Sequence, residues 1–559
     1  MTFTSKCNKI FVPTEILQKI TLHIVDDKSS LHSCALVSRH WCASLMEILW
    51  SQPFHLSNSP LLIKTYLSFL SETSHDQLKL EKCVRTKEKE SKFVFDYPSF
   101  LRKLSIPLLC DAIGEYLRRE LNMTELLSSK VYIGSLTLQI QAASDLQLFL
   151  DKQNVILREM CKLIYNKVNM INEFELYMCV GREEDASFFD RPESCLAVEE
   201  LMKSRDCFIG LKVLEYSGKG EVLDFLSKHC KRIETLKLLP ITNSIPLKIK
   251  SYIDPSIQLI NSQKNLRNLE IHNWVTPTIT SLLQSIRSQT DSLRSIKIMN
   301  CDLYKGQPLW TLSECQNLEE IIIKGNRNFN ERLLVPLMKA KFHNLKSFIY
   351  KYQMNDFING VIINEEEFIE DDVDLNEIFS RVVLNSKDNL NTVVINGFKT
   401  SQSLRNTLNS LIECRHLIEL DITLERSEEL LPLLLSIIER NQSLEKLCIT
   451  SNTPNQAEDH VDVRQVLLSF AEALPQTFKS LRLITPDWWF STSTLKRFLG
   501  DAKFRIESMC WMNQGCYLEC SEVLRQYAKL NDCKLLFGED CEFSSYNLGT
   551  FKINVTFNF

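Results

Sequence analysis

The sequence predicts an α/β protein in which a small three-helix module precedes a horseshoe-shaped solenoid of alternating strands and helices. A phrase of the form apolar-x-x-apolar-x-apolar recurs at a nearly constant spacing, and such a period is typical of one strand-plus-helix unit per repeat. Glycine (14) and proline (16) are scarce in the 559 residues, about 5 % together against a typical ~12 %. This composition suits many helices with few glycine turns.

Composition and charge exclude several classes of protein. The formal net charge is −5, so no global basic field attracts nucleic acid or an anionic membrane. The first residues lack an apolar core of signal-peptide length, and the longest apolar run, Leu430 to Ile438, is broken by Pro432. That run is far below the ~20 residues that span a bilayer. We expect a soluble cytoplasmic or nuclear protein with no nucleic-acid or membrane partner.

Residues 10–55 predict three short helices. Pro13 suits the start of the first helix, because its missing N–H is not needed there. Ser29 or Ser30 can cap the second helix and Ser38 the third. An apolar face of the first helix is formed by Ile16, Leu17, Ile20 and Ile24. The expected buried side of the second helix is Leu31, Cys34, Ala35, Leu36 and Val37, and a stripe on the third is formed by Trp41, Leu45 and Ile48 or Leu49. About 45 residues make too small a core to be secure alone.

This module contains Val-Pro-Thr-Glu-Ile-Leu (12–17), Cys-Ala-Leu-Val-Ser-Arg-His-Trp (34–41) and a distal Leu-Trp pair (49–50). These motifs resemble the F-box, a three-helix family that binds the Skp-type adaptor of cullin–RING ubiquitin ligases. Val12 stands where the family more often has leucine. The resemblance implies an F-box over residues 8–55 with adaptor contacts at Val12, Pro13, Ile16, Leu17, Ile20, Leu36, Val37, Ser38, Arg39, Trp41 and Leu45. The alternative is that these are ordinary core residues of a small helical cap.

The segment after this module divides into two parts. Residues 56–92 predict a connecting helix, with apolar residues from Leu61 to Leu70, and then a charged loop at 79–92. A solvated loop is the simpler interpretation of 79–92, and a binding or localisation patch is the alternative. Residues 93–205 are expected to be degenerate repeats or a separate packing layer. Leu136 with Leu138 and Phe174 with Leu176 are candidates for early strands.

The recurring phrase defines residues 206–559 as a repeat domain. Clear copies begin at Leu266, Leu293, Leu318, Leu345, Leu390, Leu417 and Leu444, and weaker copies begin at Leu211, Ile233, Phe478 and Ile506. The clear copies are 25 or 27 residues apart, except for 45 between Leu345 and Leu390. A period in this range indicates leucine-rich repeats, in which neighbouring units share one continuous core. The segments between the copies begin with polar residues and continue with apolar residues at helical spacing. This pattern predicts one helix per repeat.

The long interval contains an acidic insertion at residues 363–377 with eight carboxylates. Insertions in a solenoid become loops on one face. We expect a solvated loop, with binding of calcium or of a basic substrate as the alternative. The insertion lacks the glycine and the ligand order of a calcium loop.

Residues between the anchors of each strand are expected to face the concave surface, where a target protein can bind. The predicted target contacts are Arg267, Asn268, Glu270, Arg294, Lys297, Glu319, Glu320, Lys346, Glu419, Asp421, Glu445 and Lys446. Their mixed signs favour a protein partner over a nucleic-acid backbone. Trp488, Trp489 and Phe490 are either a recognition hot spot or packing of the last repeats.

No catalytic motif is recognised, and we expect no cofactor. The chain has 19 cysteines, which are expected to be mostly buried free thiols. Cys230, Cys315 and Cys414 fall three residues before their first anchors, at a small-residue position. Cysteines from Cys510 to Cys541 lack paired Cys-x-x-Cys spacing, so zinc is only an alternative there.

An F-box followed by leucine-rich repeats resembles the substrate receptors of SCF-type E3 ubiquitin ligases. The resemblance implies a non-catalytic subunit that bridges the Skp-type adaptor, and through it a cullin–RING ligase, to a target protein. Two alternatives remain at this point. The first is a leucine-rich-repeat scaffold that binds the adaptor without directing ubiquitination, and the second is an enzyme whose site has no sequence signature.

Overall fold

The computed structural model describes most of the chain, in two compact units, Met1–Lys264 and Asn265–Phe559. The described residues are 12–24, 27–84, 93–120, 136–176, 200–203, 206–217, 220–239, 255–274, 278–303, 307–327, 331–351, 375–396, 401–425, 428–452, 461–485, 488–501, 504–512 and 517–537. Residues 363–374, most of the predicted acidic insertion, lie outside them.

Three short helices open the first unit, as the sequence predicts: α1 (Thr14–Leu22), α2 (Lys28–Val37) and α3 (Arg39–Leu49). Helices α1 and α2 both pack on α3, and Leu17, Leu31 and Leu45 are fully or almost fully buried between them. The hydroxyl of Ser38 accepts a hydrogen bond from the Trp41 N–H and caps α3. The cap of α2 is Asp27 rather than Ser29 or Ser30, because its carboxylate accepts the N–H groups of both serines.

More helices lie between this module and the second strand, with α7 and α8 following the first strand. They are α4 (Pro53–Leu56), α5 (Pro60–Leu67), α6 (Glu72–Leu80), the 3-10 turn η1 (Tyr97–Phe100), α7 (Ile106–Glu120) and α8 (Leu136–Lys167). Trp50 stacks on Tyr97 with ring centroids 4.2 Å apart. The Ser51 carbonyl accepts the N–H groups of Arg102 and Lys103, both at 2.9 Å. The helical module is therefore continuous with the start of the sheet.

Among its described residues, the first unit contains four parallel strands: β1 (Lys103–Ser105), β2 (Glu173–Leu176), β3 (Val213–Tyr216) and β4 (Thr235–Leu238). They pair in chain order, with α10 (Gly220–His229) between β3 and β4. The strand expected around Phe174 is present. The one expected at Leu136 and Leu138 is not, because these residues lie in α8, whose length allows it to pack against α6 and α7.

In the second unit, ten described strands pair in parallel and in chain order. They are β5 (Asn268–His272), β6 (Ser295–Met299), β7 (Glu320–Lys324), β8 (Ser347–Lys351), β9 (Thr392–Asn396), β10 (Glu419–Glu425), β11 (Lys446–Asn452), β13 (Ser480–Ile484), β15 (Ser508–Met512) and β16 (Lys534–Phe537). Each predicted anchor phrase forms a strand, and β16 adds one that we did not predict.

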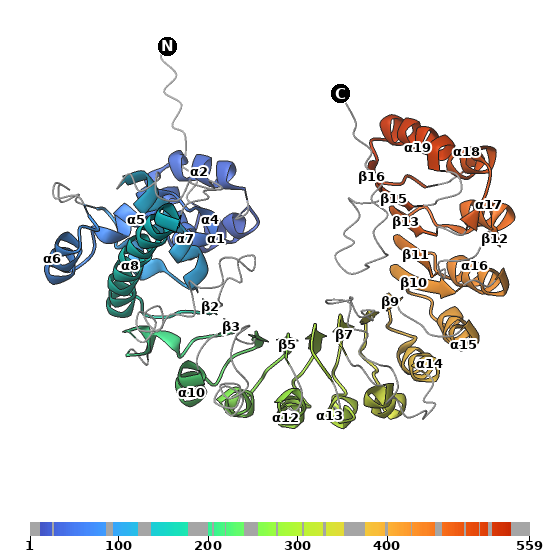
Figure 1. Cartoon of the computed structure of the whole chain (residues 1–559), viewed down its shortest axis with the longest axis horizontal. Helices are drawn as coiled ribbons and strands as arrows, with labels where there is room; N and C mark the ends of the chain where they lie inside the picture. Colours follow the sequence, from blue (N-terminus) through green and yellow to red (C-terminus); the bar gives the residue numbers. More distant parts are fainter. Residues whose placement is uncertain are drawn as a thin grey trace, which may run out of the picture. The chain divides into compact units, whose positions relative to one another are not determined.

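Helical segments alternate with these strands and lie along one side of them (Figure 1). They are α12 (Thr278–Ser285), η3 (Ile286–Gln289), α13 (Trp310–Glu314), η4 (Glu331–Lys339), α14 (Leu375–Ser386), α15 (Ser401–Ile412), η6 (Glu428–Leu430), α16 (Leu431–Arg440), α17 (Arg464–Ala473), α18 (Thr492–Asp501) and α19 (Tyr517–Asn531). A separate pair, β12 (Val461–Asp462) and β14 (Trp488–Trp489), is also parallel. The second unit is thus a βα solenoid of the leucine-rich-repeat type.

The core of the solenoid explains the period of the sequence. From β5 to β15, each strand of the sheet has at least two buried positions, as in Ile296, Ile321 and Phe348, which are in register on three neighbouring strands. One repeat cannot bury these side chains alone, so each depends on its neighbours. The Asn326 side chain, three residues after the last anchor of its strand, accepts the Cys301 N–H at 2.8 Å and donates to the Ile298 carbonyl at 3.0 Å. This is the Asn/Cys position of a leucine-rich repeat.

Candidate functional site

Five large apolar side chains are exposed on α1 and α2; one is Leu22, at 60 %, and the other four are positions predicted to contact the adaptor. The exposed fractions are 46 % for Ile16 and 44 % for Ile20 on α1, and 72 % for Leu36 and 63 % for Val37 at the end of α2. We call these four residues the N-terminal apolar patch. The expectation that Leu36 and Val37 lie on the buried side of α2 is therefore wrong, because α2 turns Leu31 and not its last residues toward the core. Exposed apolar groups of this size are typical of interaction surfaces.

The start of α3 lies beside the residues that precede α1. Val37 is followed directly by Ser38, the cap of α3, and His40 in the first turn of α3 hydrogen-bonds the Val12 carbonyl at 2.8 Å. The end of α2 and the start of α1 therefore meet at the same helix end. Pro13, Ser38 and Arg39 are exposed there, and Val12 and Trp41 are half-buried.

Two residues predicted to contact the adaptor do not reach the surface. Leu17 and Leu45 are fully buried, because they face each other's helices across the α1–α3 packing. Their role in this structure is to hold the helices that carry the exposed patch. Sequence spacing places them on the apolar side of a helix but does not distinguish a core contact from a partner contact.

The second unit presents an open strand face, which we define as the side of β5 to β16 turned away from the helices. Seven of the predicted target contacts lie on its strands: Asn268, Glu270, Lys297, Glu320, Glu419, Asp421 and Lys446. The other five each lie one residue before a strand and form a separate row along the strand starts: Arg267, Arg294, Glu319, Lys346 and Glu445. Side chains alternate along a strand, so we treat these five residues apart from the open strand face, and contact of the twelve with a target stays a prediction.

The row along the strand starts is a ladder of ion pairs. Glu319 lies between two cations, with its carboxylate 2.7 Å from Arg294 and 2.7 Å from Lys346. Hydrogen bonds from Lys346 and Arg294 lower the pKa of Glu319. Glu445 pairs in the same way with Lys479 at 2.9 Å. A hollow of about 280 Å³ lies beside this ladder, lined also by Asn317 and its counterparts in neighbouring repeats.

A buried polar network lies where the open strand face passes from β8 to β10. Lys351 on β8 pairs with Asp421 on β10 at 3.0 Å, and the Asn396 amide on β9 donates to the same carboxylate at 3.2 Å. Thr423 donates to Asn396 at 3.1 Å. Asp421, predicted as a target contact, is thus buried, and its carboxylate already interacts with Lys351 and Asn396 of the same chain. Burial raises the pKa of Cys448, and the Asp421 carboxylate adds to that rise.

A third cluster ties α4 to the first strands. The His55 ring lies 3.4 Å from the Glu175 carboxylate on β2, and Lys103 on β1 lies 3.2 Å from the same group and 3.0 Å from Glu173. Burial by itself raises the pKa of Glu175, but the hydrogen bond from His55 and the charge of Lys103 outweigh it and lower the pKa to about 2. These groups were not predicted, because they are up to 120 residues apart.

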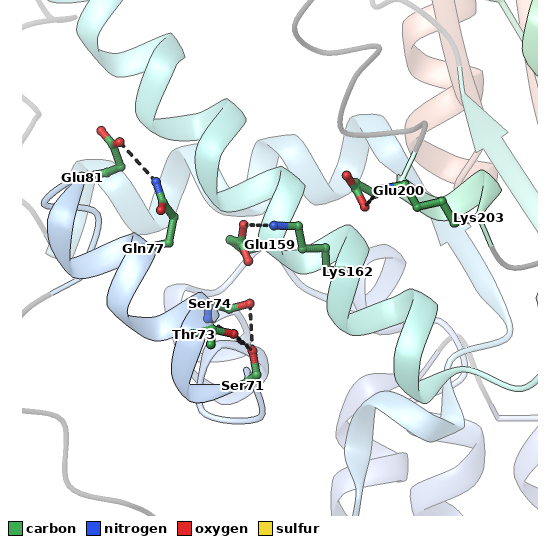
Figure 2. A network of polar contacts seen from close by, with 9 residues as sticks. All are labelled: Ser71, Thr73, Ser74, Gln77, Glu81, Glu159, Lys162, Glu200 and Lys203. Carbon is green, nitrogen blue, oxygen red and sulfur yellow. Dashed lines mark hydrogen bonds and ion pairs between the residues drawn. The ribbon is translucent and has the colours of Figure 1, made fainter.

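The polar contacts around α6 and α8 are local (Figure 2). Ser71 caps α6, accepting the Ser74 N–H, and Glu159 on α8 pairs with Lys162 at 2.6 Å. Figure 2 also shows Gln77 with Glu81 and Glu200 with Lys203, at 3.3 and 2.6 Å. Each contact joins residues a few positions apart, so it stabilises one helix and does not assemble a reactive site. The second oxygen of buried Glu159 has no hydrogen-bond partner among the described residues.

Cysteines in the described ranges are mostly buried free thiols. Cys230, Cys315 and Cys414 occupy the small-residue position that we predicted for them, and burial raises the pKa of each thiol to about 12. Cys510 is disulfide-bonded, whereas Cys516 and Cys541 lie outside the described residues. Within those residues, no group of three or more His, Cys, Asp or Glu side chains is arranged to hold a metal ion.

The segment of residues 488–490 contributes mainly to the packed core. Trp488 and Phe490 are buried, and Phe490 lies edge-on to Trp511. Trp489 is partly exposed, with the Arg464 guanidinium 4.8 Å from its ring centroid. Arg464 is itself held by Asp462 at 2.6 Å.

Within the described ranges, no helix combines the length and the apolar composition needed to cross a bilayer. No family model matches the sequence, and no curated protein matches it. Among solved structures, the chain is similar to an internalin from Listeria monocytogenes str. 4b F2365, with 13 % sequence identity, a TM-score of 0.29, and coverage of 58 % of this chain and 81 % of that one.

Proposed function

We propose that the chain is the substrate-recognition subunit of an SCF-type cullin–RING E3 ubiquitin ligase. In this proposal the N-terminal helices bind a Skp-type adaptor, and the open strand face binds the target protein. The chain supplies no catalytic group. It accelerates transfer by holding the target near the charged E2, which raises the effective concentration of the target lysine.

The observation that carries the proposal is the exposure of the N-terminal apolar patch. Ile16, Ile20, Leu36 and Val37 are positions at which the F-box resemblance implies adaptor contacts, and all four are large apolar groups in contact with water. Burying such a side chain in an interface gains about 1.5 to 3 kcal/mol. Core residues of a simple helical cap have no reason to be exposed.

The test is affinity purification from cells of the full chain and of two surface variants. Leu36→Asp places a charge on the patch, and Leu80→Asp is the matched control, because Leu80 is 75 % exposed on α6 of the same unit. Neither side chain supports the core, so both variants are expected to fold. We expect the wild type and Leu80→Asp to recover the adaptor and a cullin, and Leu36→Asp to recover at least tenfold less of both.

The other outcomes decide between the alternatives. Equal adaptor recovery by Leu36→Asp and Leu80→Asp would contradict adaptor binding through this patch. Recovery of the adaptor without a cullin would support the scaffold that binds the adaptor but does not direct ubiquitination.

A further inference from the structure

Strands β7 and β8 place like charges side by side on the open strand face. In the parallel register, Lys324 lies directly opposite Lys351. Lys351 is neutralised by Asp421 on its other side, whereas Lys324 is exposed and forms no ion pair with any described residue. Because Lys351 is already paired with Asp421, Lys324 is the lysine of this pair that is left to bind an anion supplied from outside the described residues.

The same two strands present an apolar pair beside the lysines. Ile322 lies directly opposite Ile349, two residues before Lys324 and Lys351 and therefore on the same face. Both isoleucines are partly exposed. On the next strand, β9, the two equivalent positions are not exposed, because Val394 and Asn396 are buried. We call Ile322, Lys324, Ile349 and Lys351 the β7–β8 patch.

The neighbouring charges extend the positive field. From β5 to β8, the residues that we assign to the open strand face and to the row of strand starts include six cations: Arg267, Arg294, Lys297, Lys324, Lys346 and Lys351. Four carboxylates oppose them: Glu270, Glu319, Glu320 and, from β10, the Asp421 that pairs with Lys351. The chain as a whole is negative at −5, so this excess of cations is local. Exposed cations around an apolar centre complement an acidic segment that carries an apolar side chain.

We propose that the β7–β8 patch binds an extended acidic segment of a partner protein, with a branched apolar residue on Ile322 and Ile349 and a carboxylate against Lys324. Residues two apart in a strand are separated by ~6.8 Å. An extended ligand therefore matches the patch when its apolar and acidic residues are at positions i and i+2. The proposal rests on the proposed function, because it names the class of target that the open strand face would hold.

The experiment is selection of peptides on the purified full chain in the absence of any adaptor. A random twelve-residue display library is selected on the immobilised wild-type chain, and the most enriched peptide is synthesised with a fluorescent label for anisotropy. We expect enrichment of Asp or Glu two residues from Ile, Leu or Val. We also expect an affinity that falls as salt concentration rises.

Surface variants then locate the binding site. Lys324→Glu is expected to weaken binding of the selected peptide at least tenfold, and Ile349→Asp is expected to do the same. Lys529→Glu, an exposed lysine on α19, is the matched control and should bind like the wild type. Lys324 is exposed, and a glutamate there faces Lys351, so this variant is expected to fold.

Several results would overturn the proposal. They are no enrichment over an empty support, selected peptides that are basic or wholly apolar, or unchanged affinity in Lys324→Glu. Binding that appears only when the carboxylates of residues 363–377 are neutralised would identify this chain's own acidic segment as the occupant, in place of a partner. None of these results depends on adaptor recovery, so failure here is distinguishable from failure of the proposed function.

Discussion

At the scale of single residues, the same side-chain type has different roles because of its position on an element. Leu17 and Leu36 both belong to the F-box-like motif, yet Leu17 is fully buried and Leu36 is exposed. Among carboxylates, Asp421 is buried against Lys351, whereas Glu319 is shared by two cations near the surface. Residue identity alone predicts none of these differences, since each depends on which neighbouring strand or helix comes close.

Glu175 allows a test of pH dependence at this scale. Its folded pKa of about 2 lies below its ordinary value of 4.5, so its ionised form stabilises the fold above about pH 4.5, and this contribution is lost as the pH falls toward 2. Glu175→Gln should therefore lower the free energy of unfolding at pH 7 by about 1 to 2 kcal/mol, after allowance for solvent screening. The difference from wild type should shrink below about pH 4.5.

The measurement is urea unfolding of the full chain at a series of pH values, read by peptide-level hydrogen exchange over β1 and β2. Glu47→Gln on α3 is the control, because Glu47 is exposed and is expected to have an effect within 0.5 kcal/mol. A deficit in Glu175→Gln that is constant down to pH 3 would contradict the ion-pair explanation.

At the scale of elements, buried amide side chains connect successive repeats. Asn441, at the end of α16, accepts the Leu417 N–H at 2.9 Å and donates to the Ile437 carbonyl at 2.8 Å. In the first unit, Gln263 accepts the Ile233 N–H at 3.0 Å in the same way. These bonds satisfy backbone groups at the first anchor of a repeat, where no strand partner is available. In two other repeats the position of Asn441 and Gln263, three residues before the first anchor, is taken by Cys230 and Cys414, whose small side chains are buried.

Asn441→Leu should destabilise the second unit by about 1 to 3 kcal/mol, because it leaves the Leu417 N–H buried without an acceptor. The neighbouring Gln442 is exposed and donates only to the Glu439 carbonyl. Gln442→Leu is therefore the matched control, with an expected change below 0.5 kcal/mol. Urea unfolding read by hydrogen exchange over β10 and α16 measures both. Equal effects of the two substitutions would argue against the amide connection.

At the scale of the whole molecule, the proposed adaptor and target surfaces belong to different compact units. The N-terminal apolar patch lies within Met1–Lys264, and the β7–β8 patch lies within Asn265–Phe559. In a repeat architecture, each unit contacts mainly its neighbours, so stability is nearly a sum of local terms. A destabilising substitution in one repeat is therefore expected to lower the stability of that repeat and its neighbours, but not that of the entire chain.

Ile422→Asp tests this expectation. Ile422 is fully buried in β10, opposite Ile395 of β9 and Ile449 of β11, and an unpaired carboxylate there is costly. Hydrogen exchange should accelerate at least tenfold in β9, β10 and β11, while α1 to α3 and β1 to β2 keep wild-type protection. Loss of protection in α1 to α3 would contradict local stability, and Thr450→Asp on a half-exposed position of β11 serves as the control.

The sequence alone determined the elements that local physics specifies: three N-terminal helices, the Ser38 cap and the strand at each anchor phrase. The period of the apolar residues predicts the strands, because apolar residues that recur at a fixed spacing must face a shared core. Only the tertiary structure decided which apolar residues face water, so Leu36 is exposed and Leu17 is buried. It also decided that Asp421 pairs with Lys351, 70 residues away, and that Lys324 lies opposite Lys351. These contacts depend on parallel register between repeats, and that register is set by packing of the complete stack.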